Sequence, residues 1–592
     1  VGEHQQVRQP VLAVEGRDAA LGHRAQHQRV HLRPRAVDLV EEEDRQLLAV
    51  ADQRPRLHRE YMDMLGLWPL PAKTPLKATI TKTFEHQGVV IECLHFQSIP
   101  GLYVTANFYR PAKASPAAKL PTILYVCGHS NKGRDGNKSD YQDHGMWFAS
   151  NGYNCLVLDT LQLGEIPAVH HGTYGRPWNH LKAYEKDDPS RERKRPEDTT
   201  RWWWHSAGYT PAGVECWNGV RAIDYLVSRN DVNPDKIAVT GISGGGASTV
   251  WIAAADDRVK VAVPVSGMSD LESYVKNKVV NGHCDCMFLY NTYQWDWTTI
   301  AALVAPRPLL FANSDNDPIF PMDGNRRIIA KLRQIYEMYG KPDLVDDYVS
   351  KGGHAYRPDL RIAVFKFLNK HLKGDEKAAV KDVAFEKIAG KDLRVFPTDA
   401  DVPKDAINQR VDEVFVPRAK VELPEKGKFE EWRKTMLHEL KAKCFRGFPE
   451  RVKAASRVKT DQDLPGALLE TEEGIRALLM DGRIDRVGDE DALKKLPLVL
   501  LVSDVSHSDK KGLASLKLPG SADWLILTRR VFDPWSMKSP PNYVERSHIL
   551  LGQHVNVGRI RDIVAAVRFA EELEPTRKAH LWGHGEAGIL AL

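Results

Sequence analysis

The 592-residue sequence lacks four features that would each indicate a class of protein or site. It has no apolar run that approaches the roughly 18 residues needed to cross a bilayer as a helix, so we expect no membrane span. Its seven cysteines are odd in number and scattered, which excludes a disulfide framework. Cys284-Asp285-Cys286 lacks the second ligand pair of a zinc site, so we interpret it as structural and expect no metal. The net charge of +5 is small for this length, and no nucleic-acid partner is expected.

The first 60 residues lack lysine, serine, threonine, isoleucine, asparagine, cysteine, methionine and every aromatic residue. The ten types that remain are those whose codons begin, or can begin, with G or C. We therefore interpret residues 1–60 as a disordered arm, or as GC-rich DNA read in the wrong frame or beyond the true start, and assign them no fold. If residues 1–60 are such a misreading, they stand in place of any genuine signal peptide, so its absence gives no information on localisation. Order is expected to begin near Tyr61.

The most informative stretch is residues 236–255, which read as strand, turn and helix. Residues 237–240 form a β-branched run and residues 247–255 an alanine-rich helix. Between them lies Gly241-Ile242-Ser243-Gly244-Gly245, a G-x-S-x-G motif in the context that gives it meaning. We expect a strained turn that lifts the Ser243 hydroxyl above a sheet and leaves room only for glycine on either side.

Apolar strands alternate with helices over residues 61–374. A hairpin is expected from residues 89–96 and 103–109, and further strands from residues 120–126, 154–158, 261–265 and 308–311. Helices are expected over residues 141–151, 219–228 and 360–372, with a long polar insertion at residues 160–210. This pattern predicts the α/β class: a doubly wound, mostly parallel sheet with helices on both faces.

The chain changes character after the predicted catalytic domain, residues 61–374. Residues 375–427 read as an irregular linker, and residues 428–592 as a partial second copy of the same half-sheet. In that copy Gly585 stands where Ser243 stands, so the copy is interpreted as degenerate. The chain reaches Leu592 before any strand that could supply an acid or a histidine, which we interpret as a truncation. Residues 61–374 are expected to be active alone.

A serine nucleophile needs a general base and an acid that orients it, in the chain order Ser, Asp or Glu, His. The predicted acid is Asp317, in preference to Asp315, because Asp317 lies four residues before Pro321 in a D-x-x-hydrophobic-P turn. The predicted base is His354, which follows two glycines and precedes a helix. The backbone N–H groups of Gly244 and His129 are the predicted oxyanion hole.

These residues carry a resemblance to a known family. Gln97-Ser98-Ile99-Pro100-Gly101, Gly241-Ile242-Ser243-Gly244-Gly245-Gly246, Ala305-Pro306-Arg307-Pro308 and Gly352-Gly353-His354 resemble the acetyl xylan esterase and dienelactone-hydrolase-like branch of the α/β-hydrolase superfamily. The resemblance implies hydrolysis of esters, commonly acetyl groups on plant polysaccharide, without metal or organic cofactor. A secreted or periplasmic enzyme is expected. Cys127-Gly128-His129 departs from the His-Gly loop of many relatives.

Three functions are alternatives to the removal of acetyl groups from a polysaccharide. A glucuronoyl-type esterase shares the architecture but acts on esters of bulky alcohols. A peptidase of the prolyl oligopeptidase type carries a large N-terminal propeller, whereas only 60 doubtful residues precede this fold. A non-catalytic carbohydrate-binding scaffold is opposed by the intact serine, acid and histidine.

Candidate substrate contacts come from aromatic residues and one histidine. Trp203, Trp204 and Trp297, with their neighbours Trp178, Trp202 and Trp295, are predicted either to stack on sugar rings or to pack loops over the sheet. His283 reaches the site from the loop after residues 261–265 or belongs to a buried polar turn.

Overall fold

The computed structural model describes residues 45–115, 118–166, 168, 208–283, 287, 289–380, 382, 384–416, 420, 422–445, 448–459, 466–481, 495–503, 523–527, 548–552, 555–584 and 590–591. Most of the polar insertion, with Trp178 and Trp202 to Trp204, lies outside these ranges, as do Cys284 to Cys286 and Gly585.

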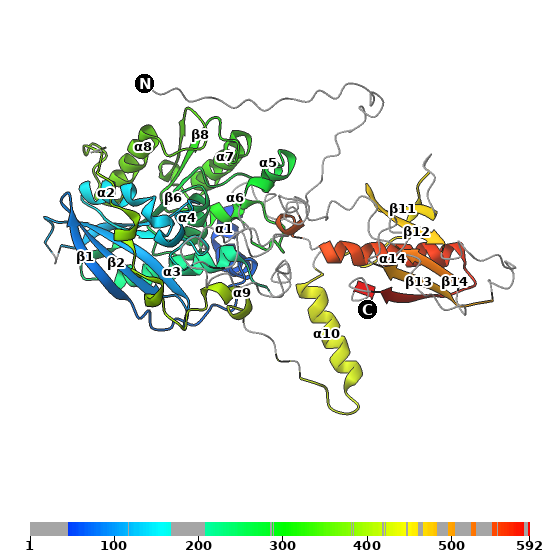
Figure 1. Cartoon of the computed structure of the whole chain (residues 1–592). Coiled ribbons are helices and arrows are strands. Elements are labelled where there is room, and N and C mark those ends of the chain that lie inside the picture. The colour runs from blue at the N-terminus through cyan, green and yellow to red at the C-terminus, as the bar shows by residue number, and fades with distance from the viewer. Residues whose placement is uncertain are drawn as a thin grey trace, which may run out of the picture.

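A nine-stranded sheet organises the first part of the chain, in the order β1-β2-β3-β5-β4-β6-β7-β8-β9 (Figure 1). The strands from β1 to β5 in this order pair antiparallel, and every pair from β5 to β9 is parallel. The strands are β1 (Thr79–His86), β2 (Val89–Gln97), β3 (Tyr103–Pro111), β4 (Leu120–Val126), β5 (Asn154–Leu158), β6 (Val232–Ile242), β7 (Val261–Val265), β8 (Leu309–Ser314) and β9 (Val345–Ser350).

Helices bury both faces of the parallel part of this sheet. One core contains side chains of α1 (Arg45–Met64), α3 (Pro211–Ser228), α4 (Gly244–Ala255), α6 (Trp297–Ala302) and α7 (Met322–Met338). The core on the other face contains side chains of α2 (Gln142–Ser150) and α8 (Pro358–Leu368). Because both faces are covered, β5 and β7 are buried along their whole length, which explains their continuous apolar sequences.

The predicted α/β class and doubly wound sheet are confirmed. The hairpin of β2 and β3 forms as expected, and β4, β5 and β7 begin and end at the predicted residues. The sequence reasoning missed two edge strands, β1 and β9. β1 is mostly exposed and β9 is partly exposed, and the sequences of both are less apolar than those of the central strands.

The absence of fold assigned to residues 1–60 is wrong for the last part of that segment. Residues 45–60 belong to α1, from which Leu57 and Tyr61 are buried in the first core. The Tyr61 hydroxyl donates to the carbonyl of Trp251 at 2.9 Å, and an Arg54 guanidinium nitrogen to that of Ala305 at 2.8 Å. The skewed composition concealed an apolar helix face, which is sufficient to dock a helix on α4.

The interpretation of residues 375–427 as a linker is also wrong. Leu393, Val395 and Phe396 are buried against the first sheet, and Val411 belongs to the core that contains α3 and α4. We call residues 388–411 the strap. The Gly101 carbonyl accepts the N–H of Ile407 at 2.9 Å, and the Leu393 carbonyl accepts the side-chain amide of Asn107 at 3.1 Å. The backbone of this irregular charged sequence forms its hydrogen bonds with the domain of the first sheet instead of within elements of its own.

A second sheet has the order β10-β11-β12-β14-β13-β15. The first three pairs are antiparallel, and β13 is parallel to both β14 and β15. Order and directions correspond strand for strand to β1-β2-β3-β5-β4-β6, which supports our proposal of a second copy. The strands are β10 (Ser456–Arg457), β11 (Gly466–Glu472), β12 (Ile475–Asp481), β13 (Leu498–Ser503), β14 (Asp523–Leu527) and β15 (Ala579–His584).

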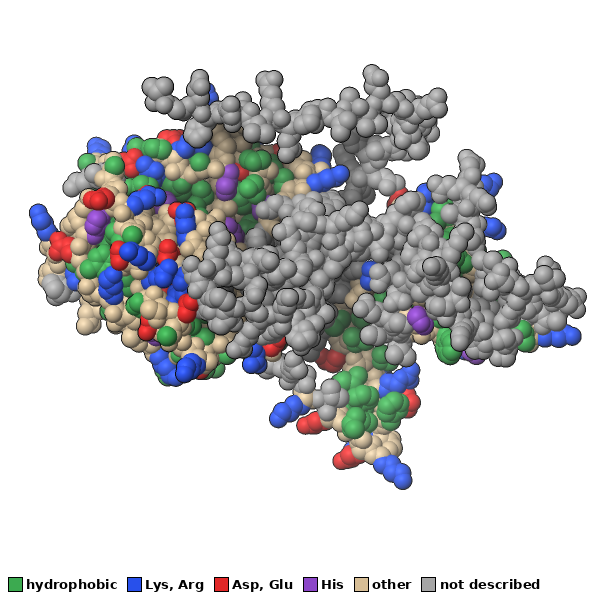
Figure 2. Space-filling view, in the orientation of Figure 1, with side chains coloured by type: hydrophobic (Ala, Val, Ile, Leu, Met, Phe, Trp, Pro, Cys, Tyr) green, Lys and Arg blue, Asp and Glu red, His purple; other side chains and the backbone are tan. Residues whose placement is uncertain are grey.

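The helices of the later chain differ in burial. α14 (Val555–Leu573) buries Ile563 and Ala566 in the core of the second sheet, as α3 does before β6. α10 (Phe429–Lys443) instead exposes Phe429, Met436, Leu437 and Leu440, visible as a hydrophobic surface on this helix (Figure 2). None of the described helices has the length and hydropathy of a membrane span.

Candidate active site

Ser243 occupies the turn between β6 and α4 in a strained conformation. Its φ is 62° and its ψ −124°, values that residues with a side chain rarely adopt and that occur mainly at functional sites. Its N–H donates to the Val265 carbonyl at 2.9 Å, and its own carbonyl accepts the Ala247 N–H at 3.0 Å. The hydroxyl-bearing side chain is partly exposed at the carboxyl end of β6.

The glycines around Ser243 permit close backbone approaches. A Cβ at Gly241 or at Gly245 would lie 2.1 Å from the carbonyl oxygen of Val126, at the end of the neighbouring strand β4. No side chain fits at that distance, so the predicted requirement for glycine at these two positions is confirmed.

The structure pairs Asp317 with His354 at the carboxyl ends of β8 and β9. His354 Nδ1 donates to Asp317 Oδ2 at 2.7 Å, while Asp317 Oδ1 accepts the N–H groups of Ile319 at 2.9 Å and Phe320 at 3.1 Å. Burial by itself would raise the pKa of Asp317. The hydrogen bonds from His354 and the two N–H groups outweigh burial, and the pKa lies below its usual value.

Asp315, the alternative acid, has a different partner. Its side chain is exposed and accepts the Gly352 N–H at 2.8 Å, and its backbone N–H donates to the Ser350 carbonyl at 2.9 Å. Asp315 therefore fixes the start of the loop that carries His354, whereas Asp317 binds the imidazole itself.

Arg357 fastens the His354 loop from the other side. Its guanidinium donates to Ser350 Oγ at 2.7 Å, Ser314 Oγ at 2.6 Å and the Gly353 carbonyl at 2.7 Å. Five donors in a rigid fork suit Arg to hold three acceptors at once. The loop thus has fixed ends on β8 and β9, although His354 itself is partly exposed.

The two predicted oxyanion donors lie on neighbouring elements. Gly244 is the first residue of α4, where N–H groups have no partner inside the helix. Gly128 follows β4, and a Cβ on it would stand 2.6 Å from the Ile242 carbonyl oxygen and 3.4 Å from Ser243 Cβ. The peptide that joins Gly128 to His129 therefore begins beside Ser243.

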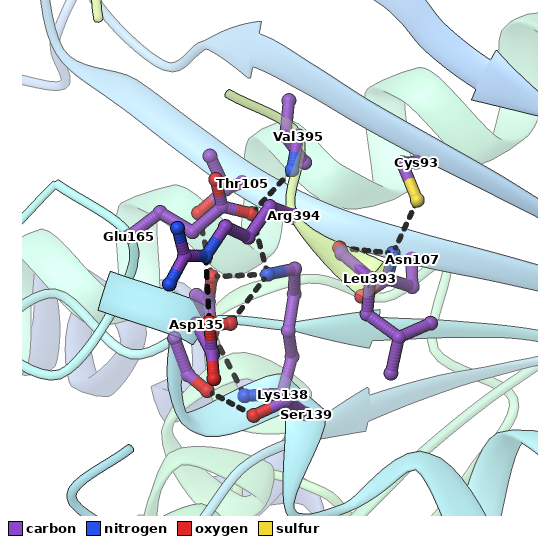
Figure 3. A network of polar contacts seen from close by, with 12 residues as sticks. Cys93, Thr105, Asn107, Asp135, Lys138, Ser139, Glu165, Leu393, Arg394 and Val395 are labelled. Carbon is purple, nitrogen blue, oxygen red and sulfur yellow. Dashed lines mark hydrogen bonds and ion pairs between the residues drawn. The ribbon is translucent and has the colours of Figure 1, made fainter. Parts of the chain in front are cut away.

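A buried ion network supports the loop after β4 (Figure 3). Lys138 Nζ lies 2.6 Å from Glu165 and 3.2 Å from Asp159, and the Lys138 and Glu165 side chains are 0% exposed. Glu165 also accepts the N–H groups of Val395 at 2.6 Å and Phe396 at 2.9 Å. The strap and the loop that carries His129 are therefore joined through one buried carboxylate.

The structure does not present the predicted substrate residues as a platform. Trp297 is 0% exposed and packs on Trp251 and Tyr274, with ring centroids 5.2 and 4.8 Å apart, so its prediction as a stacking surface is wrong. The large apolar indole gains more from the core of α4 and α6 than from a surface position. Trp203 and Trp204 lie outside the described residues.

His283 lies one ring away from His354. It is buried and packs on Tyr274 and Phe320 with centroids 4.7 and 4.9 Å apart. Phe320 in turn stacks on His354 at 5.6 Å. Sequence reasoning missed Phe320, although it is the hydrophobic residue of the D-x-x-hydrophobic-P turn used to select Asp317.

A comparison with protein families matches the same part of the chain. Residues 200–375, which include Ser243, Asp317 and His354, match the model of the prolyl oligopeptidase family. Together with the parallel sheet and the strained serine after β6, this match identifies the fold. The chain has the α/β-hydrolase fold.

Known relatives of this α/β-hydrolase differ in how much of it they cover. "Putative hydrolase YtaP" of Bacillus subtilis (strain 168) is 26% identical over 324 residues, which cover 54% of this chain and 99% of the relative. A 4-O-methyl-glucuronoyl methylesterase of Phanerochaete carnosa is 27% identical over 200 residues, 29% of this chain and 49% of the relative. The solved structure of Methylesterase BT1017 is 20% identical, with a TM-score of 0.47, over 67% of this hydrolase and 79% of that chain.

Proposed function

We propose that the chain is a serine carboxylic-ester hydrolase that acts through Ser243, His354 and Asp317. The observation that carries the proposal is the hydrogen bond between His354 and Asp317, which follow β9 and β8 at the same edge of the sheet as Ser243, with β7 between them and β6. A histidine oriented by a buried carboxylate is the base that a serine nucleophile requires. The strained backbone of Ser243 supports the same role.

The proposed reaction has two steps. His354 Nδ1 is bound to Asp317, so Nε2 takes the proton of Ser243 as its Oγ attacks the ester carbonyl carbon. The tetrahedral oxyanion accepts the N–H groups of Gly244 and His129, and it collapses to an acyl-enzyme as His354 protonates the departing alcohol. Water, deprotonated by His354, then attacks the acyl-enzyme and releases the acid and free Ser243.

The proposed substrate is an acetylated plant polysaccharide such as xylan. The resemblance of the four sequence phrases to acetyl xylan esterases supports it. The partly exposed Ser243 and His354 side chains are accessible to an ester group on a polymer. Trp203 and Trp204 remain proposed sugar contacts.

Two other substrates each have an observation in their favour. The relative of Phanerochaete carnosa is named as a glucuronoyl methylesterase, which supports a methyl ester of a sugar acid as the alternative. The match to the prolyl oligopeptidase family supports a peptide bond after proline. Both reactions would use the same three residues, so only the substrate distinguishes them.

The decisive experiment measures acetate release from acetylated xylan, with p-nitrophenyl acetate, a methyl glucuronate and a prolyl p-nitroanilide in parallel. Ser243→Ala is expected to lower kcat by about 10^6. Ser248→Ala, which removes a hydroxyl one turn along α4, is the matched control and should retain activity. Turnover of the small ester but not of xylan would discard the polymer. No Ser243-dependent turnover of any substrate would favour a non-catalytic carbohydrate-binding scaffold.

A further inference from the structure

The second oxyanion donor depends on the orientation of one peptide unit. In a trans peptide the carbonyl and the N–H point in opposite directions. The carbonyl of Gly128 and the N–H of His129 belong to the same unit, and Gly128 lies against Ser243. Whatever holds the Gly128 carbonyl therefore also directs the His129 N–H.

Asn137 holds that carbonyl. Its Nδ2 donates to the Gly128 oxygen at 2.8 Å and to Thr160 Oγ1 at 3.0 Å, and its Oδ1 accepts the Thr160 N–H at 3.1 Å. Asn137 is fully buried and lies nine residues after Gly128. Both amide hydrogens and the carbonyl oxygen are thus engaged, which leaves the side chain a single orientation.

The backbone around Asn137 is fixed just as firmly. The Asn137 N–H donates to the Leu163 carbonyl at 2.8 Å, and the adjacent Lys138 N–H to Asp159 Oδ1 at 2.8 Å. Lys138 is anchored by its ion pairs with Asp159 and Glu165. The short helix that carries Asn137 (Asn137–Ser139) is therefore a rigid mount for its side chain.

We propose that Asn137 is a positioning residue that directs the His129 N–H at the oxyanion of the reaction. The inference rests on the proposed esterase function and adds to it a residue that does not touch the substrate. Losing an oxyanion donor typically costs about 10^2 to 10^3 in kcat. Because Asn137 orients the donor without being one, a fall of about 10- to 100-fold is expected when it is replaced.

The test compares Asn137→Asp and Asn137→Ala with Asn154→Ala in the full chain. Asn154 is a buried asparagine at the amino end of β5, the end away from Ser243, where it donates to the Asp231 carbonyl at 2.8 Å. kcat and KM for p-nitrophenyl acetate are measured per active site, titrated with a fluorophosphonate. Both Asn137 variants are expected to lose kcat with KM nearly unchanged. Asn154→Ala should keep the wild-type kcat even if it is less stable.

Asn137→Asp adds a pH dependence of kcat that would not be expected if Asn137 served only in packing. Its carboxyl can donate to the Gly128 carbonyl only when protonated. The kcat of this variant relative to wild type should therefore rise as pH falls, whereas the relative kcat of Asn137→Ala should stay constant. Rescue of Asn137→Asp at low pH, measured against wild type, supports the proposal even if Asn137→Ala does not fold. Where both variants fold, rescue is expected in Asn137→Asp alone.

Three results would overturn the inference. One is a wild-type kcat in folded Asn137→Ala, and another is an equal loss of kcat in Asn154→Ala. In both cases Ser243-dependent hydrolysis by the wild type would leave the proposed function intact. A wild type without such hydrolysis would overturn the proposed function and this inference together.

Discussion

The buried ion network of Lys138, Asp159 and Glu165 predicts a large loss of stability when its lysine is replaced. Lys138→Met would leave the Glu165 carboxylate, 0% exposed, without its cation at 2.6 Å, and Asp159 without its cation at 3.2 Å. Burial tends to lower the pKa of Lys138, but Asp159 and Glu165 outweigh it and keep the pKa above the usual value. Lys138 is therefore charged in the native state, and its removal leaves uncompensated buried charge.

Removing one partner of a buried pair typically costs about 3–5 kcal/mol, and this value is expected for Lys138→Met. Part of the Glu165 charge remains balanced by the N–H groups of Val395 and Phe396 and by Arg134 at 3.4 Å, so the lower end of that range is favoured. The double variant with Glu165→Gln should recover at least about 1 kcal/mol, because it removes one of the unpaired charges.

The assay is urea unfolding followed by intrinsic fluorescence. Lys82→Met is the control, because exposed Lys82 also reaches the strap, through the Asp392 carbonyl at 2.9 Å, and should cost less than about 1 kcal/mol. A Lys138→Met chain within about 1 kcal/mol of wild type would refute the reasoning. So would a double variant less stable than the single one.

Four further predictions concern the site. Asp317→Asn should lower kcat for p-nitrophenyl acetate by about 10^4, whereas Asp315→Asn should change it only a few-fold; the reverse order would reassign the acid. Arg357→Ala, which frees the loop of His354, should lower kcat by about tenfold with little change in Tm, and an unaffected kcat would contradict that role. The strap revises our expectation that residues 61–374 are active alone: a chain ended at residue 374 should hydrolyse no ester and one ended at residue 416 should, because only the longer chain keeps the strap. Activity of the shorter chain would show that the strap is dispensable. The pKa of Asp317 is lowered in the folded state, so Asp317 stabilises the fold above its unfolded pKa of about 3.9, and this stability is lost as pH falls through the folded value. Asp317→Asn should therefore flatten the acid limb of a profile of Tm against pH. An unchanged profile would exclude this contribution.

Local sequence was enough for the centre of the fold. The runs of β4, β5 and β7 are apolar because both faces of the sheet are covered, and a pattern of that kind is visible within a few residues. The turn at Ser243 could also be predicted from local sequence, because its glycines are required by contacts with the adjacent strand that every such turn makes.

The choice between Asp317 and Asp315 could be made only in part from the sequence. A short turn motif favoured Asp317, and the structure places its carboxylate on His354, 37 positions away. Asp315, two residues earlier, faces the Gly352 N–H instead. The direction of each side chain is set by the backbone turn after β8, which spacing alone describes only in part.

Tertiary structure alone decided what packs on this frame. The strap bonds to Glu165 across 230 positions of chain, and Trp297 enters the core through contacts with Trp251 and Tyr274. Local sequence predicts neither set of contacts, since an irregular segment or a tryptophan has the same sequence whether its partner is protein, solvent or sugar. The sequence by itself determined the central strands of the sheet and the turn that holds Ser243, because periodicity and turn chemistry act over a few residues. Burial and long-range hydrogen bonds assigned the strap, α1 and Asn137 their places, because those contacts exist only once the chain has folded.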